Sequence, residues 1–329
     1  MTSLSVIIAT YNRAPILKET LEAMTQVDRT ALDVQWIVVD NNSTDGTAAV
    51  LESFTCQLPL KCLFEPKPGK NNALNTVLRS AVLQDIVVFT DDDISPASDW
   101  LIQIARACER YSDISVFGGR IALRWPSAPP RWLVSSWMRS FGFSEHDFGP
   151  VDRPYAPGCY PFGGNFWLRR ELFESGRTFR AEMGPMKDKR IMGSETSFLR
   201  PLAEEGEKMV YCPEVVVEHR IKTSDGHFRI LRKRAYSLGR GIAQMSGLHH
   251  KHLYIERPRL WHLRQALKAL IGTSKLAWAY CRPTQARRIE AVCRAYAYLG
   301  HLVETYNLTK KAAERHSSAL LTKRPAIKL

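Results

Sequence analysis

The chain has 329 residues, of which 45% are hydrophobic and 24% charged, so it can bury a sizeable globular core. The apolar stretch at the N-terminus is too short for a secretion signal, and no apolar run reaches the roughly 18 residues of a membrane-spanning helix. The seven cysteines show no Cys-x-x-Cys and no regular spacing, which argues for reduced thiols and against a zinc site or a disulfide framework. We therefore expect a cytoplasmic globular protein.

The net charge of +13 is unevenly distributed along the chain. From His219 to the C-terminus there are 23 Lys and Arg against 5 Asp and Glu, whereas the preceding residues have a small acidic excess. Such a basic segment predicts an anionic surface as its partner. Nucleic acid is one such surface, but the segment has no helix-turn-helix spacing, zinc ligands or aromatic platform motif. We expect no nucleic-acid partner.

Strand and helix patterns alternate along the first part of the chain. Strands are predicted at Leu4–Thr10, Val34–Asp40, Lys61–Phe64, Asp85–Thr90 and Ile114–Val116, and helices at Pro15–Met24, from Thr47, at Ala73–Leu83 and around Leu101–Cys108. This alternation predicts an α/β fold with a doubly wound, mostly parallel sheet covered by helices on both faces. Residues 121–162 lack clean periodicity, so we expect long ordered loops with short helices there, where a substrate-selecting lid would lie.

Three adjacent carboxylates, Asp91, Asp92 and Asp93, directly follow the apolar strand predicted at Asp85–Thr90. Adjacent ionised carboxylates repel one another and resist desolvation, so they need either bulk water or a bound cation. One interpretation is a solvated strand-to-helix turn in which Ser95-Pro96 starts the helix. The other is a ligand site.

Two further polar clusters stand at strand carboxyl ends, Thr10-Tyr11-Asn12 and Asp40. Ligands of doubly wound sheets bind beyond these ends, so we expect the three clusters to converge on one crevice. The chain has no Gly-x-Gly-x-x-Gly after its first strand and no P-loop. Carboxylates in such a crevice suit a hard divalent cation, Mg²⁺ or Mn²⁺, that bridges to a nucleotide diphosphate.

Six ordered segments, "SVIIATYNR", "IVVDNNSTDGT", "GKNNALN", "VVFTDDDI", "GGNFWLRRELF" and "GSETSFLRPLAEEG", resemble the family 2 glycosyltransferases over roughly residues 3–240. The resemblance implies a GT-A fold with a catalytic domain over 1–240, followed by a helical basic extension over 241–329. Within the catalytic domain, residues 1–120 would bind the nucleotide sugar and residues 121–240 the acceptor.

The resemblance also implies roles for single residues. Asp93 would be the direct metal ligand, with Asp91 near the ribose and the metal waters. His219 follows a further strand-like run, where it would meet the metal or the diphosphate, although a lone histidine at a strand end is also typical of a structural or solvated residue. The nucleotide-sugar site would comprise Thr10, Tyr11, Asn12, Asp40 at the base edge, Lys70 facing the phosphates, Asp91 and Asp92.

On the acceptor side, Gly163, Gly164 and Asn165 match a turn where the backbone approaches the sugar, and a plain turn is the alternative. Glu195 matches the catalytic base, which relatives commonly carry within Glu-Asp; here Ser194 precedes it and Pro201 interrupts the following helix. An acid that merely stabilises a helix start is the alternative for Glu195.

The implied activity is inverting transfer of one sugar from a UDP- or GDP-type donor to a hydroxyl of a glycan or lipid-linked glycan, in polysaccharide or glycolipid assembly. The alternative is a non-catalytic nucleotide-sugar-binding or scaffold protein on the same fold.

Two apolar stripes in the C-terminal extension recur at helical spacing. They are Leu263, Ala266, Leu267 and Leu270 in one stripe, and Ile289, Val292, Cys293, Tyr296 and Leu299 in the other. Taken alone, the stripes favour two packed helices with a solvated basic face. The basic excess favours a second role, peripheral association with an anionic membrane surface on the cytoplasmic side, without a spanning helix.

Overall fold

The computed structural model describes residues 2–186, 190–246 and 258–322. Its contacts divide the chain into two compact units. The first comprises Met1–Pro129 and Arg139–Asp225, and the second comprises Pro130–Met138 and Gly226–Leu329. The domain limit expected at residue 240 falls inside α7 (Phe228–Met245), a helix of the second unit.

The first unit is built on a mixed sheet with the strand order β3-β2-β1-β4-β8-β6-β11-β5, and β7 pairs with β11. Neighbours β3, β2, β1 and β4 are parallel, as are β6 and β11, whereas β8 runs antiparallel between β4 and β6. The predicted doubly wound, mostly parallel α/β sheet is thereby confirmed. The strands are β1 (Thr2–Thr10), β2 (Leu32–Asp40), β3 (Leu60–Phe64), β4 (Ile86–Asp91), β5 (Ile94–Pro96), β6 (Val116–Arg124), β7 (Arg153–Pro154), β8 (Asn165–Arg169) and β11 (Met209–Arg220), with a separate hairpin of β9 (Gly184–Pro185) and β10 (Arg190–Ile191).

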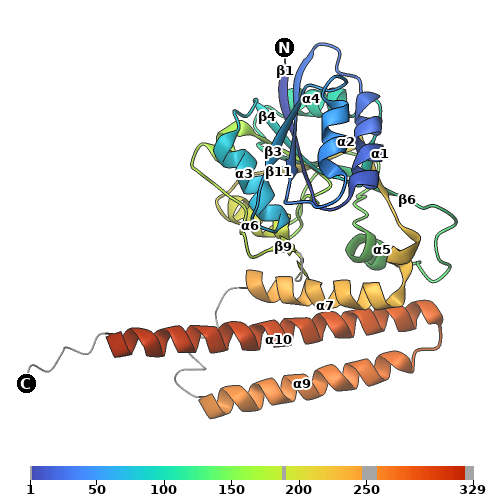
Figure 1. Ribbon diagram of the computed structural model, residues 1–329. Helices are drawn as coiled ribbons and strands as arrows, with labels where there is room; N and C mark the ends of the chain where they lie inside the picture. Colours follow the sequence, from blue (N-terminus) through green and yellow to red (C-terminus); the bar gives the residue numbers. More distant parts are fainter. Residues whose placement is uncertain (1, 187–189, 247–257, 323–329) are drawn as a thin grey trace, which may run out of the picture. The chain divides into compact units, whose positions relative to one another are not determined.

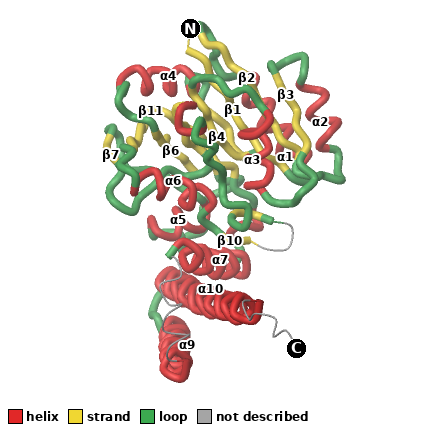
Figure 2. The backbone as a smooth tube through the Cα atoms, turned by 90° about the vertical axis from the view of Figure 1, so that its left-hand side faces the viewer, coloured by secondary structure: helices red, strands yellow, loops and turns green. Residues whose placement is uncertain are grey.

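Helices cover both faces of this sheet (Figures 1 and 2). Val6 and Ile8 of β1 belong to one hydrophobic cluster, together with Leu17 of α1 and Trp100 of α4. Ile7 points to the opposite face, into a second cluster with residues of α3 and α6. A strand buried on both faces needs a continuous apolar run, which explains why β1 lacks polar alternation. The helices are α1 (Ala14–Thr25), α2 (Thr47–Phe54), α3 (Lys70–Ser80), α4 (Trp100–Arg110), α5 (Ser136–Phe143) and α6 (Ser194–Glu204), with the short 3₁₀ turns η1 (Arg170–Phe173) and η2 (Thr223–Gly226).

The structure does not support the interpretation of the three carboxylates as a strand-to-helix turn. Ser95-Pro96 does not start a helix: it belongs to strand β5, and α4 begins only at Trp100. β5 pairs antiparallel with the end of β11, with His219 opposite Ile94, and it forms the edge of the sheet. Proline is tolerated on an edge strand because its missing N–H need not join a ladder.

The strand predicted at Ile114–Val116 is also placed differently, because β6 begins at Val116 and continues to Arg124. Its second half lies in the region expected to be loop. That half pairs with Val216–Arg220 of β11 after a register shift, so the pairing partner rather than local periodicity fixes the strand there.

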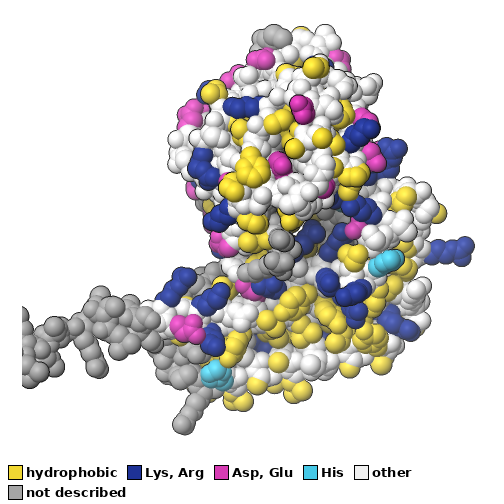
Figure 3. Space-filling model, viewed as in Figure 1, with side chains coloured by type: hydrophobic (Ala, Val, Ile, Leu, Met, Phe, Trp, Pro, Cys, Tyr) yellow, Lys and Arg dark blue, Asp and Glu magenta, His cyan; other side chains and the backbone are white. Residues whose placement is uncertain are grey.

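The second unit contains the helices α7, α9 (Pro258–Tyr280) and α10 (Gln285–Thr322), with α10 beside both of the others (Figure 1). The second predicted stripe is confirmed as a packing surface at Ile289, Val292 and Cys293, which are buried. The first stripe is not: Leu263, Leu267 and Leu270 of α9 are exposed, and hydrophobic side chains gather over α9 in Figure 3.

Candidate active site

The carboxyl ends of β1, β2 and β4 lie side by side. Thr10 is paired in register with Asp40, and Ala9 with Asp91. The Thr10 hydroxyl donates a hydrogen bond to Asp92 Oδ2 at 2.8 Å. The three polar clusters that the strand ends were expected to bring together therefore meet at one edge of the sheet.

Asp92 is buried and held from two sides. Arg13, at the start of α1, forms an ion pair with its carboxylate, and Thr20 Oγ1 donates to the Asp92 carbonyl oxygen at 2.6 Å. Burial raises the pKa of Asp92 to about 6, because desolvation of the carboxylate outweighs the lowering effect of the Arg13 charge. Asp92 thus anchors α1 to the end of β4, with its side chain turned away from solvent.

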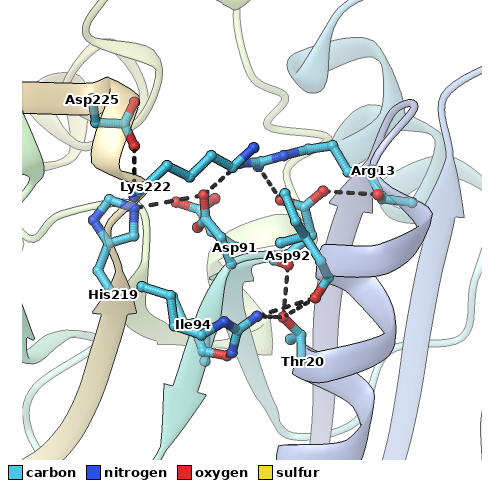
Figure 4. A network of polar contacts seen from close by, with 12 residues as sticks. Arg13, Thr20, Asp91, Asp92, Ile94, His219, Lys222 and Asp225 are labelled. Carbon is cyan, nitrogen blue, oxygen red and sulfur yellow. Dashed lines mark hydrogen bonds and ion pairs between the residues drawn. The ribbon is translucent and has the colours of Figure 1, made fainter. Parts of the chain in front are cut away.

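Asp93 lies between two basic side chains. Arg13 Nη2 donates to Asp93 Oδ2 at 2.8 Å, and His219 Nε2 lies 3.5 Å from the same oxygen. Figure 4 shows Asp91 and Asp92 between Arg13 and His219, which comes from β11. Burial alone would raise the pKa of Asp93, but the contacts with His219 and Arg13 outweigh it and hold this pKa well below its usual range.

His219 is fixed by its second ring nitrogen. Nδ1 lies 2.7 Å from the carbonyl oxygen of Phe143, which fixes Nδ1 as the protonated nitrogen and turns Nε2 toward Asp93. Burial lowers the pKa of His219, but the hydrogen bond and the charge of Asp93 outweigh it, and the net effect is a raised pKa.

Lys70 lies between the carboxylate run and the predicted acceptor-side turn. It opens α3 and forms an ion pair with Asp91. A Cβ built on Gly163 would lie 3.7 Å from Lys70 Nζ and 3.4 Å from Glu195 Oε2, so these groups surround the glycine backbone. Burial lowers the pKa of Lys70, but Asp91 and then Glu195 outweigh it and raise this pKa.

A small pocket opens at this point. Glu195, in the first turn of α6, lines it with Lys70, Thr90, Gly163 and Ser194. The rest of the lining is apolar and comes from Leu74, Phe89, Phe166 and Phe179. Gly164 faces the other side of the cluster, since a Cβ there would lie 3.6 Å from Asp91 Oδ2. A side chain at either glycine would enter the space beside the carboxylates.

Asn165, by contrast, is part of the scaffold. Its amide donates to the carbonyl oxygens of Arg120 at 2.9 Å and Val215 at 2.8 Å, and its oxygen accepts the Trp100 indole N–H at 3.0 Å. With every polar atom engaged and the side chain fully buried, Asn165 links β8, β6, β11 and α4 behind the glycines.

The residues predicted to contact the nucleotide after β1 and β2 form a network of turn hydrogen bonds. Asn12 has a left-handed backbone (φ 50°), and its side chain accepts the Thr44 N–H at 2.7 Å. Asp40 Oδ1 accepts the Ser43 N–H at 2.9 Å. Tyr11 between them is half-buried. These bonds tie the loop after β1 to the loop after β2, so both face the same edge of the sheet.

Among the residues that the structure describes, no group of three or more His, Cys, Asp or Glu side chains is arranged to hold a metal ion. The two potential metal-ligand atoms that face each other are Asp93 Oδ2 and His219 Nε2. Nucleotide sites bind Mg²⁺ or Mn²⁺ through one or two protein ligands, and phosphates and water complete the shell. Asp93 and His219 would fit as those ligands if Asp93 were released from Arg13 and Nε2 of His219 were deprotonated.

Two basic residues of the site were missed by sequence reasoning. Arg13 pairs with both Asp92 and Asp93, and Arg220 binds Ile94 O at 2.6 Å and Ser95 Oγ at 2.7 Å. The signal for Arg13 was its position in the "TYNR" segment after β1. Arg220 follows His219 at the end of β11, and only the antiparallel pairing with β5 brings it here.

Comparison with known proteins agrees with this fold. The chain is 28% identical over 306 residues to the succinoglycan biosynthesis protein ExoM of Rhizobium meliloti, with 89% of each chain covered. It is 23% identical over 199 residues to a glucosyl-dolichyl phosphate glucuronosyltransferase of Haloferax volcanii, covering 59% of this chain and 63% of that one.

A solved structure also shares the fold. It is the mannosyltransferase PcManGT of Pyrobaculum calidifontis, in complex with GDP-Man and Mn²⁺, with a TM-score of 0.59, 23% identity, and 92% of this chain and 87% of that chain covered. The model of the family described as "Glycosyl transferase family 2" matches residues 5–177, more than half of the chain and all three strand-end clusters. This chain belongs to glycosyl transferase family 2, has the GT-A fold and is a glycosyltransferase.

Proposed function

We propose that this enzyme transfers one sugar from a nucleoside-diphosphate sugar to an acceptor hydroxyl, with inversion at the anomeric carbon. One arrangement carries the proposal: the Glu195 carboxylate lies beside Gly163 and Lys70, and Lys70 pairs with Asp91. A carboxylate base and a cation for phosphate thus line one pocket, beside the strand ends where a nucleotide would bind.

The donor would lie along the ends of β1, β2 and β4. Thr10, Tyr11, Asn12 and Asp40 would contact the nucleoside, with Asp92 as the support behind them. Lys70 and Arg13 supply positive charge toward the diphosphate. The GDP-Man named for the structural relative supports a nucleoside-diphosphate sugar as the donor, and the proposed types are UDP- and GDP-sugars.

A divalent cation, Mn²⁺ or Mg²⁺, would be held by Asp93 and His219, with Asp91 in reach through water. When bound, the ion neutralises charge that develops on the departing diphosphate. The Mn²⁺ named for the structural relative supports this choice of ion.

The acceptor would enter over Gly163 and Gly164. Glu195 takes the proton from the acceptor hydroxyl, whose oxygen attacks the anomeric carbon from the face opposite the diphosphate. The new glycosidic bond forms as the bond to the diphosphate oxygen breaks, and Lys70 stabilises the departing charge. One displacement of this kind inverts the configuration.

A glycan or a lipid-linked glycan is the proposed acceptor. The names of the two sequence relatives support it, since one belongs to succinoglycan biosynthesis and the other acts on a glucosyl-dolichyl phosphate. Assembly of a polysaccharide or glycolipid follows as the proposed process.

The test is to incubate the full chain with UDP- and GDP-sugars and Mn²⁺, and to measure both thermal stabilisation and release of nucleoside diphosphate. We expect one donor to stabilise the fold and to be consumed, because only a bound ligand raises the melting temperature. NMR of the product would show the anomeric configuration opposite to that of the donor. Binding without consumption of any donor, with lipid-linked and free glycan acceptors present, would indicate a scaffold protein instead.

A further inference from the structure

Helix α9 contacts α10 along one narrow side. A Cβ built on Gly272 would lie 2.9 Å from Leu299 and 3.1 Å from Tyr298, so the helices approach closely there. Near the start of α9 the Trp261 ring packs on the Tyr306 ring at 5.5 Å. Among the side chains of α9 whose burial is described, only Trp261, Gly272 and Ala279 are buried.

Six large apolar residues of α9 lie on another side and are exposed. Their spacing of three, four and seven residues places them within an arc of roughly 100°. They are Leu260 (53% exposed), Leu263 (67%), Leu267 (57%), Leu270 (66%), Ile271 (40%) and Trp278 (57%). Figure 3 shows the resulting apolar surface along α9, which we call the α9 apolar face.

A helix in a water-soluble bundle turns its apolar stripe toward the core, whereas α9 turns its apolar stripe toward solvent. A continuous exposed stripe of this size marks a surface that binds another apolar phase. From Leu260 to Trp278 it extends about 27 Å at 1.5 Å per residue.

The basic residues beside the α9 apolar face indicate that its partner is anionic. Pro258–Tyr280 contains four Lys and Arg and no Asp or Glu. Helical spacing places Arg264 and Lys275 beside the stripe, and Lys275 Nζ lies 4.4 Å from the centre of the Tyr298 ring of α10. Arg282 stacks on the Trp278 ring at 3.4 Å. Two copies of so basic a segment repel each other, whereas an anionic lipid surface attracts it.

We propose that the α9 apolar face docks in the headgroup region of an anionic phospholipid bilayer, with the helix lying in the plane of the membrane. Leucines enter the acyl boundary, Trp278 sits at headgroup level, and the flanking basic residues meet lipid phosphates. No helix among the described residues is long and apolar enough to cross a membrane. The proposal does not depend on the chemistry proposed for the catalytic site.

The first test is co-sedimentation of the full chain with vesicles of equal parts phosphatidylcholine and phosphatidylglycerol, at low and at high salt. We expect binding at low salt and weaker binding at high salt, because salt screens the basic flank. The double variant Leu263→Gln/Leu267→Gln should bind about tenfold more weakly or worse. Val82→Gln/Val151→Gln is the matched control, since these valines are 86% and 57% exposed in the first unit, and it should bind like the wild type.

The second test locates the contact. Vesicles that carry a spin-labelled lipid should quench tryptophan fluorescence of the wild type, and Trp278→Phe should lose most of that quenching while it still sediments. All these residues are exposed, so the variants should keep the wild-type melting temperature and nucleotide binding.

Wild-type protein that ignores anionic vesicles at low salt would overturn the proposal. So would unchanged binding by Leu263→Gln/Leu267→Gln. If light scattering shows a lipid-free oligomer that this double variant dissociates, the α9 apolar face binds a second copy of the chain and the membrane proposal is wrong.

Discussion

Ser194 donates a hydrogen bond from its hydroxyl to Asn71 Oδ1, and this bond joins the first turns of α6 and α3. Both residues are buried, and the Asn71 amide nitrogen also donates to the carbonyl oxygen of Arg180 at 2.7 Å. Lys70 directly precedes Asn71, and Glu195 directly follows Ser194. The bond therefore sets how far the proposed base lies from the lysine that faces Asp91.

Ser194→Ala should lower kcat more than it raises the KM for the donor. The change leaves a buried acceptor on Asn71 without its donor, at a cost of about 1–3 kcal/mol in folding free energy, and it releases the first turn of α6. Ser194→Thr keeps a hydroxyl and should recover most of the loss. Ser197→Ala is the control, because that hydroxyl donates within the helix, to the Ser194 carbonyl oxygen at 2.7 Å. An unchanged kcat in Ser194→Ala would show that the bond does not position Glu195.

Glu195→Gln should reduce turnover by about 10²-fold or more, because the amide keeps the shape of the side chain but cannot accept a proton. Nucleotide binding should stay close to that of the wild type. Glu204→Gln is the matched control, as Glu204 lies on the same helix, is exposed and pairs with Arg200 at 2.7 Å. Near-normal turnover in Glu195→Gln would move the base elsewhere, and Glu182 is then the next carboxylate to change.

Asp93→Ala should abolish the part of nucleoside-diphosphate binding that depends on Mn²⁺, and Asp40→Ala should weaken nucleotide binding with or without the ion. The reason is that Asp93 faces His219, whereas Asp40 holds the turn after β2. Asp99→Ala serves as the control, since Asp99 is exposed near the start of α4 and accepts a local hydrogen bond from Gln103 at 2.8 Å. Calorimetry with and without EDTA measures both effects. Full activity in excess EDTA would end the proposal of a divalent cofactor.

The meeting of Thr10, Asp40 and Asp92 could be predicted because the carboxyl ends of adjacent parallel strands share one edge of a sheet. The ion pairs of Arg13 could not, because periodicity places the start of α1 but not the direction of a long side chain. β5 was missed for a related reason: its partner is β11, more than a hundred residues later in the chain. On α9, spacing identified the Leu263 stripe, but it says nothing of which side faces a neighbour. Long-range pairing and helix rotation are set by tertiary contacts.

His146 gives the fold a dependence on pH that is separate from the site. Its ring is buried, Nε2 lies 2.6 Å from the Tyr155 hydroxyl, and it stacks on Phe162 at a centroid distance of 4.5 Å. Burial lowers the pKa of His146 from 6.5 to about 4, and the Asp147 charge opposes this only partly. Between these two values the unfolded chain binds a proton that the folded chain does not. The contribution of His146 to the free energy of unfolding is therefore complete above pH 6.5 and is lost as pH falls toward 4.

His146→Gln should therefore flatten the acid side of the stability curve. Glutamine can still bond to the Tyr155 hydroxyl but does not titrate. At about pH 5 the wild type should have lost about 2 kcal/mol of unfolding free energy through this histidine, and the variant should not show that loss. Urea unfolding of both proteins across pH 5–8 isolates the effect as a difference, which removes the contributions of every other group. His262→Gln, a change at an exposed histidine, should keep the wild-type curve. If the curves of the wild type and His146→Gln stay parallel down to pH 5, the ring is not held neutral by its burial, and the aromatic cluster around it admits water or charge.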